Sequence, residues 1–195
     1  LVRARLAALS PLAEKAGWLR ADDLLERAAA AADLIARGRA PKDALSFLAP
    51  RGSFSVVRRG GRVFASSRSW ARYDTVGRAA AALDPAAAAR TLTELAPLLD
   101  EACRRYGCRG SFRDSLSGAI GELAQAPAAG GESALVASKR GIGWAYADPR
   151  LEALDPAQKQ LLRLGPRNAA AVQGFLRALA AALGPSAPPP PRRVP

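Results

Sequence analysis

The sequence predicts a mainly helical α+β fold with about six to eight helices and two β-hairpins that form a small antiparallel sheet. Apolar residues recur at helical spacing along most of the chain, and this period gives way to strand-like runs only at residues 53–66 and 133–148. Helix caps, glycines and prolines divide the helical parts into separate segments. Because a two-stranded hairpin is marginal by itself, we expect both hairpins to join one sheet covered by the helices.

The N-terminal part predicts two helices and a loop. Leucines at helical spacing mark the first helix over residues 2–16, which is a candidate peripheral helix. The second helix covers residues 22–37, with Asp22 or Asp23 as its N-cap and a glycine after its last turn. Residues 41–50 lie between two prolines and predict a connecting loop.

The first hairpin, SFSVVRRGGRVFAS (53–66), has two runs of β-branched and aromatic residues around a Gly60-Gly61 turn. A helix is expected to follow from Ser69 onwards, in SWARYDTVGRAAAAL. The next helix starts at Asp84-Pro85. Proline has no backbone N–H, but this costs nothing at the first helical position because an N–H there has no partner within the helix. Pro97 lies inside this span and should kink it or split it in two.

The C-terminal half predicts a helix from Ser111, the second hairpin, and three further helix starts. Asp148-Pro149 and Asp155-Pro156 have the cap and first-turn residues of helices. The final helix is expected to start at Pro166 and to end the single globular domain, which we place at residues 1–183. Residues 184–195 form a proline-rich tail that we expect to be disordered.

Positive charge is concentrated in one segment. The chain has a net charge of +12, and residues 51–72 contain six arginines and no acid. One interpretation is a solvated face that protects a strand edge from pairing. The other is an anion-binding finger for lipid headgroups, nucleic acid or an acidic partner.

Two further stretches contain candidate binding residues. In SWARYD (69–74), Trp70 and Tyr73 are expected to pack inward while Arg72 pairs with a carboxylate such as Glu101; alternatively, Arg72 and Tyr73 border a pocket for an anionic group. In LDPAQKQLLRLGPRN (154–168), most residues are explained by helix caps and buried leucines, and a DNA-reading helix is disfavoured because the following helix has the pattern of a core helix. The candidate anion- or partner-binding residues are Arg58, Arg59, Arg62, Arg68, Arg72, Tyr73, Lys159, Arg163 and Asn168.

Several kinds of chemistry are disfavoured by composition. The chain has no histidine, which is the commonest general base and a common metal ligand. Phosphate-loop, dinucleotide-binding and Gly-x-Ser-x-Gly patterns are also missing, so no catalytic, cofactor or metal residue is predicted. Asp148 and Glu152 are the remaining carboxylate pair. Cys103 and Cys108 lie five positions apart across a helix end, which favours free thiols, although a turn at Gly107 would bring them together.

Four segments in this order resemble a bacterial family known as DUF3014, a domain of unknown function. They are SWARYD (69–74), PLLDEACRRYG (97–107), FRDSLSGAIGELAQAP (112–127) and DPRLEALDPAQKQLLRLGPRN (148–168). The resemblance extends over about residues 20 to 183 and supplies no catalytic residue. It implies a membrane anchor ahead of the domain, as is common in the family, and therefore a location in the cell envelope, on the periplasmic side of the inner membrane. The start of the chain without methionine fits such an anchored protein.

These observations lead to one functional hypothesis and two alternatives. The leading hypothesis is a non-enzymatic binding or scaffold domain of the bacterial cell envelope that presents the basic hairpin to a protein or to an anionic lipid surface. The first alternative is a nucleic-acid-binding protein, with a cytoplasmic location. The second is an enzyme that uses carboxylates in a concave pocket.

Overall fold

The computed structural model describes residues 2–15, 17–127, 133–138 and 143–184. Within these residues, eleven α-helices and four β-strands form a mainly helical α+β fold, which confirms the predicted fold class. The helices are more numerous than expected because three of the predicted helical spans are each divided in two. The predicted tail lies almost entirely outside the described residues, as does the tip of the second hairpin.

The N-terminal part of the chain forms three α-helices and two short 3₁₀ helices. The expected helix over residues 2–16 is interrupted at Ser10, which is followed by a proline. Asp23 takes the N-cap position of the third helix without a side-chain cap bond and with a left-handed backbone, φ 55°. The elements are α1 (Val2–Leu9), α2 (Pro11–Lys15), the 3₁₀ helix η1 (Trp18–Arg20), α3 (Leu24–Ala36) and the 3₁₀ helix η2 (Ser46–Leu48).

The central and C-terminal helices follow the predicted caps closely. Asp84, Ser111, Asp148 and Asp155 each accept a hydrogen bond from a backbone N–H in the first turn. Pro97 lies in the first turn after a break at Leu95, so the predicted split is confirmed. The elements are α4 (Ser67–Ala71), α5 (Asp74–Ala82), α6 (Pro85–Glu94), α7 (Ala96–Tyr106), α8 (Phe112–Ala124), α9 (Pro149–Glu152), α10 (Pro156–Leu162) and α11 (Pro166–Leu183).

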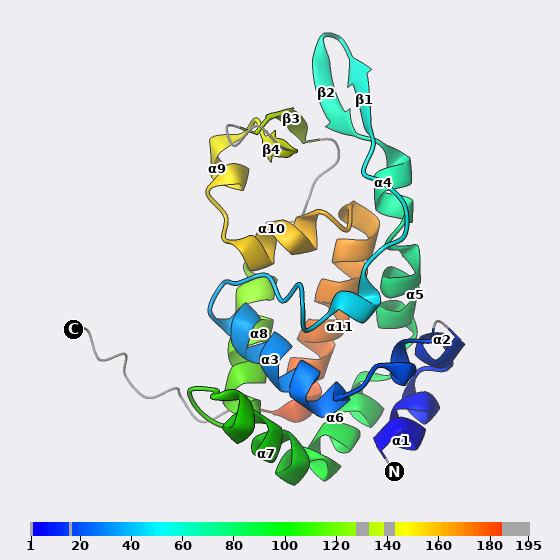
Figure 1. Cartoon of the computed structure of the whole chain (residues 1–195), viewed down its shortest axis with the longest axis vertical. Helices are drawn as coiled ribbons and strands as arrows, with labels where there is room; N and C mark the ends of the chain where they lie inside the picture. The colour runs from blue at the N-terminus through cyan, green and yellow to red at the C-terminus, as the bar shows by residue number, and fades with distance from the viewer. Residues whose placement is uncertain (1, 16, 128–132, 139–142, 185–195) are drawn as a thin grey trace, which may run out of the picture.

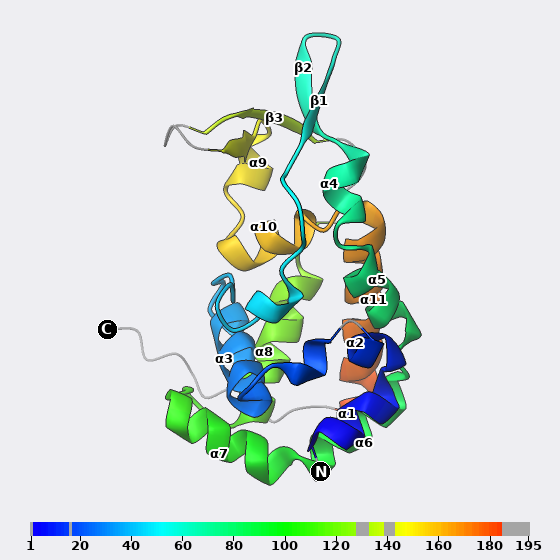
Figure 2. The same cartoon turned by 45° about the vertical axis from the view of Figure 1, so that its right-hand side comes forward.

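The two hairpins pair in one antiparallel sheet, as predicted. The strands are β1 (Val56–Arg59), β2 (Arg62–Ala65), β3 (Ala134–Ala137) and β4 (Trp144–Tyr146), in the order β1-β2-β3-β4. β2 pairs with β3 through Val63 and Phe64, while Arg59 and Arg62 lie opposite each other next to the turn. The tip of the β1–β2 hairpin projects beyond the rest of the sheet (Figures 1 and 2).

The molecule has a sheet end and a helical end (Figure 1). α3, α8 and α11 run through its middle, while α6 and α7 close the end opposite the sheet. Small residues dominate the core of the helical end: Ala29 and Ala102 are fully buried beside Leu99, which is 2% exposed. At Gly118 in α8, an added Cβ would lie 2.9 Å from the Cβ of Ala36, so this glycine lets α8 approach α3 closely.

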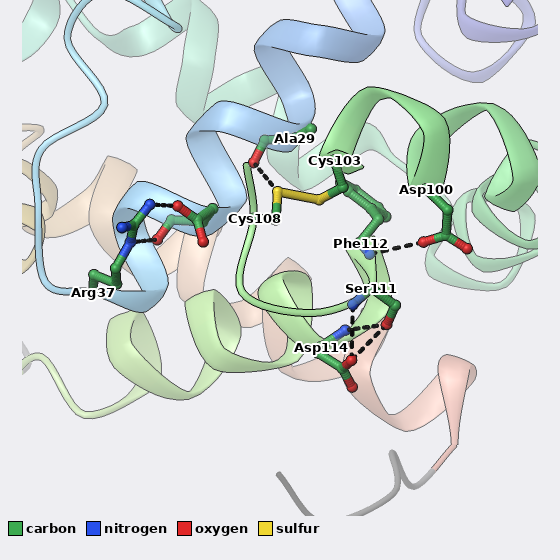
Figure 3. Close-up of a disulfide and its surroundings, with 9 residues drawn as sticks. Ala29, Arg37, Asp100, Cys103, Cys108, Ser111, Phe112 and Asp114 are labelled. Carbon is green, nitrogen blue, oxygen red and sulfur yellow. Dashed lines mark hydrogen bonds and ion pairs between the residues drawn. A yellow bond between two sulfur atoms is a disulfide. The ribbon is translucent and has the colours of Figure 1, made fainter. Parts of the chain in front are cut away.

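A disulfide joins Cys103 and Cys108, so the prediction of free thiols is wrong (Figure 3). α7 ends at Gly107 in the left-handed conformation, φ 88°, and the N–H groups of Gly107 and Cys108 both bond to the Cys103 carbonyl, at 2.9 and 3.0 Å. This helix-ending turn brings the two Cα atoms to 5.1 Å, well within disulfide range. The sequence contained the necessary signal, a glycine directly before the second cysteine.

Candidate functional site

The tip of the β1–β2 hairpin presents arginines on a narrow stem. Gly60 and Gly61 have φ values of 52° and 74°, the paired positive values that a tight two-residue hairpin turn requires. Arg59 and Arg62 lie directly opposite each other next to this turn, and Arg58 lies opposite Val63. The side chains of all three arginines are exposed.

Most of this positive charge is not neutralised by carboxylates of the described chain. Arg58, Arg62 and Arg68 make no ion pair with any described residue, and the guanidinium of Arg62 lies 5.9 Å from the Phe64 ring. Arg68 is exposed in α4, at the base of the hairpin. Like charges placed this close raise the local positive potential and attract anions.

The base of the hairpin is fixed to α4 by serine hydrogen bonds. Ser69, 1% exposed, donates to the Ser55 carbonyl at 2.8 Å and accepts from the Ser55 N–H at the same distance. The N–H of Ser66 also donates to the Ser55 carbonyl, at 3.0 Å. The sequence predicted Ser69 only as a helix start, but in the structure this residue orients the hairpin.

A cleft of about 690 Å³ lies at the sheet end, below the hairpin. Its lining residues belong to α4, to the sheet, to α9 and to the junction of α10 and α11. Figure 1 shows α9 on the left, α4 on the right and α10 below them. Its lining includes the aromatic residues Phe54, Trp70, Tyr73, Trp144 and Tyr146, together with the charged residues Arg72, Asp148, Glu152 and Arg163.

Arg72 is held in place at the side of this cleft. Its Nη1 donates to the Gly52 carbonyl at 2.8 Å and its Nε to the Ser69 carbonyl at 3.2 Å. The guanidinium carbon also lies 6.0 Å from the Phe54 ring centre and 5.7 Å from that of Tyr73. The expected pairing of Arg72 with a carboxylate such as Glu101 is wrong.

Glu101 instead pairs with arginines of its own helix, Arg104 and Arg105, three and four residues further on. The alternative expectation, in which Arg72 and Tyr73 border a pocket, agrees with their positions in the cleft lining.

Glu152 joins α9 to the edge of the sheet and to α10. Its Oε2 accepts the N–H of Tyr146 in β4 at 3.0 Å, and Lys159 donates to its Oε1 at 3.2 Å and to its carbonyl at 2.8 Å. The Tyr146 N–H, followed by Lys159, lowers the pKa of Glu152 below its usual 4.5. Asp148 has its own structural role, because Oδ1 accepts the Arg150 N–H at 2.8 Å.

The two remaining polar residues of 154–168 lie in different surroundings. Arg163 is exposed at the cleft, and its guanidinium makes one long hydrogen bond, 3.5 Å, to Gln160. Asn168 is 5% exposed; its Nδ2 lies 3.0 Å from Asp74 Oδ1 and 3.1 Å from the carbonyls of Trp70 and Leu164. Arg163 therefore lies exposed at the cleft, whereas Asn168 connects the start of α11 to α4 and α5 inside the molecule.

Glycines allow this connection to be close. Gly165, φ 84°, faces Trp70 so tightly that an added Cβ would lie 2.4 Å from the Trp70 Cγ. An added Cβ at Gly77 would lie 2.2 Å from Asn168 Oδ1. The segments 69–74 and 148–168 thus meet around one cleft although they are far apart in the chain.

A family model described as "Protein of unknown function (DUF3014)" matches residues 24–180.

The chain belongs to this family. The cleft and the hairpin both lie within the range matched by the DUF3014 model. No curated protein and no solved structure matches the chain.

The described part of this DUF3014 chain shows neither a cluster of three or more potential metal-binding side chains nor a helix long and apolar enough to span a membrane. Burial raises the pKa of Tyr146, so its phenol stays protonated at neutral pH. The lowered pKa of Glu152 keeps that carboxylate ionised. With these protonation states the cleft presents aromatic surfaces, a phenol hydroxyl, guanidinium groups and carboxylates.

Proposed function

We propose that this DUF3014 domain is a non-enzymatic binding domain of the cell envelope that presents Arg58, Arg59 and Arg62 to an anionic lipid surface. The observation that carries the proposal is the position of these arginines on the tip of a hairpin that projects beyond the sheet. The stem is fixed to α4 through Ser69, so the charges are presented in a defined orientation. Each arginine near an anionic membrane surface contributes about 1 kcal/mol.

The chemistry of the tip favours lipid headgroups. Around the turn the exposed side chains are guanidinium groups, and Gly60 and Gly61 add no apolar surface. Such a tip recognises a density of phosphate groups at the membrane surface and does not insert into the hydrocarbon layer. A two-stranded ribbon also fits the major groove of DNA, which makes nucleic acid the competing partner.

The disulfide supports a location in the envelope. Disulfides persist in oxidising compartments such as the bacterial periplasm, whereas cytosolic thiols are kept reduced. Cys103 is 1% exposed within the core of the helical end, which protects the bond from reductants in solution. This favours the periplasmic side of the inner membrane over the cytoplasm, where a nucleic-acid partner would be found.

The carboxylates of the cleft support a non-enzymatic role. Glu152 is ionised by a lowered pKa and is bonded to Tyr146 and Lys159, so it has no proton to donate as a general acid at neutral pH. Asp148 accepts the N-cap bond of α9. Both carboxylates therefore have structural hydrogen bonds, and this supports a non-enzymatic role.

Binding to vesicles tests the hairpin directly. We expect the domain to bind vesicles rich in phosphatidylglycerol, but not phosphatidylcholine vesicles, and to dissociate as salt screens the charges. Arg58→Glu/Arg62→Glu should weaken binding at least tenfold, because two attractive charges become repulsive. The matched control is Arg39→Glu/Arg177→Glu, which changes the net charge equally at exposed positions outside the hairpin.

Two results would contradict this proposal. Equal losses in the two double variants would show that net charge, and not the hairpin, governs binding. Tighter binding to duplex DNA than to anionic vesicles at the same salt concentration would assign the hairpin to nucleic acid.

The compartment is tested separately, in cells that express the full-length protein. Thiols are trapped by acid and then alkylated under denaturing conditions. We expect Cys103 and Cys108 to remain unmodified until a reductant is added; their alkylation without reductant would place the domain in a reducing compartment.

A further inference from the structure

The cleft at the sheet end has the size and lining of a ligand site that is separate from the hairpin. Its volume of about 690 Å³ falls within the range of small-molecule pockets, roughly 300–1,000 Å³. Aromatic rings reach it from the segment before β1, from α4 and from β4. Some of this aromatic surface is open to water: Phe54 is 42% exposed and Trp144 is 36% exposed. Rings arranged in this way offer stacking surfaces to a flat molecule.

The charged groups of the cleft select the sign of the ligand. Its carboxylates are already bonded within the protein, Glu152 to Tyr146 and Lys159, and Asp148 to the first turn of α9. Its guanidinium groups, in contrast, make no ion pair with any described residue. Each carboxylate of the cleft thus accepts a hydrogen bond within the protein, whereas neither guanidinium is paired with a described carboxylate, and this difference favours an anionic group over a cationic one.

The two arginines have complementary roles in this arrangement. Arg72 is oriented by hydrogen bonds to the carbonyls of Gly52 and Ser69 and by the neighbouring rings, so it loses little freedom when it binds an anion. Arg163, on the α10–α11 junction, is exposed; its guanidinium makes a long bond to Gln160, and its charge also acts on Glu152 without forming an ion pair. A planar guanidinium fits a carboxylate through two parallel hydrogen bonds.

We propose that this cleft binds a small molecule with a flat apolar body and a carboxylate group. The body stacks among Trp70, Tyr73 and Trp144, and the carboxylate is bound by Arg163, with Arg72 as a second, fixed cation of the lining. The inference goes beyond the hairpin's proposed role, because Arg58, Arg59 and Arg62 are not among the lining residues. Either site can exist without the other.

The tryptophans of the chain make this site directly observable. The chain has three tryptophans; Trp70 and Trp144 line the cleft, and Trp18 lies in η1, outside it. Their indole N–H groups each give a cross-peak in a ¹H–¹⁵N spectrum. A ligand in the cleft shifts the cross-peaks of Trp70 and Trp144, while that of Trp18 serves as an internal control.

The probes are 1-naphthoate and its neutral counterpart 1-naphthalenemethanol, which share the same ring system. We expect millimolar 1-naphthoate to shift the Trp70 and Trp144 cross-peaks saturably without moving that of Trp18. The alcohol should bind at least tenfold more weakly, because it leaves the guanidinium groups unpaired. A titration without saturable shifts at Trp70 and Trp144, or one with equal affinity for acid and alcohol, would overturn the proposal.

A matched pair of variants locates the carboxylate. Arg163→Gln and Arg167→Gln each remove one exposed positive charge from the same segment, but only Arg163 lines the cleft. Naphthoate affinity should fall at least fivefold in Arg163→Gln and remain within a factor of two in Arg167→Gln. Equal losses of naphthoate affinity in the two variants would show that net charge alone is responsible and would contradict the assigned role of Arg163. An unchanged spectrum of the free variant shows that its fold is intact.

Discussion

The two ends of the molecule are built from different residues. At the helical end, α3, α7 and α8 pack through alanines and a few leucines around the disulfide. At the sheet end, aromatic rings and arginines surround a cleft, and the hairpin carries exposed charge. Alanine buries little area per residue, so the helical end depends on close approach of its backbones. The alanine-rich core with its disulfide and the cleft lined by aromatic and charged residues thus lie at opposite ends of this DUF3014 domain.

This separation implies that substitutions at the two ends have different consequences. A change in the helical core should lower the free energy of unfolding of the whole domain. A change at the cleft or hairpin should alter binding with a smaller effect on stability.

The largest effect is expected for Leu99→Ala. Leu99 is 2% exposed in the core of the helical end, and truncation of such a leucine leaves a cavity that costs about 3 kcal/mol. Chemical denaturation measures the loss, with Leu98→Ala on the exposed face of the same helix as control. A loss below about 1 kcal/mol for Leu99→Ala would mean that the alanine-rich core collapses readily around the missing side chain.

Removal of the disulfide is expected to have the second largest effect. A bridge between residues five positions apart restricts only a short loop of the unfolded chain, which corresponds to about 2 kcal/mol. Cys103→Ala/Cys108→Ala should lose this amount in denaturation, and reduction of the wild type should lose a similar amount. The indole N–H cross-peaks of Trp70 and Trp144 should keep their positions; if they moved, the two ends would be coupled.

A smaller loss is expected for Asn168→Ala, which acts at the junction between the ends. Loss of the amide leaves the Trp70 and Leu164 carbonyls without this donor, at a cost of about 1 to 2 kcal/mol. Denaturation should show this loss, while Arg167→Ala next to it, at an exposed position, should change stability by less than about 0.5 kcal/mol. If both changes were equally mild, the connection between α11 and α4 would be made by packing alone.

The smallest effect concerns the protonation of Glu152. Its folded-state pKa is lowered, so the associated stabilisation is present above pH 4.5 and is lost as the pH falls through the lower, folded-state value. The contribution to stability is small, because the Glu152 side chain is 43% exposed. An NMR titration should place the pKa below 4.5 and show only a partial return in Lys159→Gln, because the Tyr146 N–H is the main cause. A full return would make Lys159 the dominant partner.

Much of the fold followed from local signals in the sequence. Asp84, Ser111 and Asp155 cap helices as predicted, and Gly60-Gly61 forms the hairpin turn, because caps and tight turns depend on residues close in the chain. The disulfide was predicted incorrectly because spacing alone was weighed above the chain reversal that Gly107 produces.

The cleft could be predicted only in part. A position of Arg72 and Tyr73 at the edge of a pocket for an anionic group was the alternative interpretation, and Arg163 was a candidate binding residue. The meeting of 69–74 with 148–168 depends on Gly165 against Trp70 and on Asn168 against Asp74, contacts between residues about a hundred positions apart. Single-residue patterns do not contain such pairings. Trp144 and Tyr146 of the second hairpin line the cleft because β3 and β4 pair beside β2 in the sheet, an arrangement that the structure was needed to show.

The hydrogen bond from the Tyr146 N–H to Glu152 has a consequence for assembly. This N–H belongs to β4, an outer strand of the sheet, and a strand from another chain would need it as a donor. Since Glu152 already accepts it, a strand added beside β4 would lack this donor unless the carboxylate were displaced. One acidic side chain of α9 thus occupies a backbone donor on the outer edge of β4.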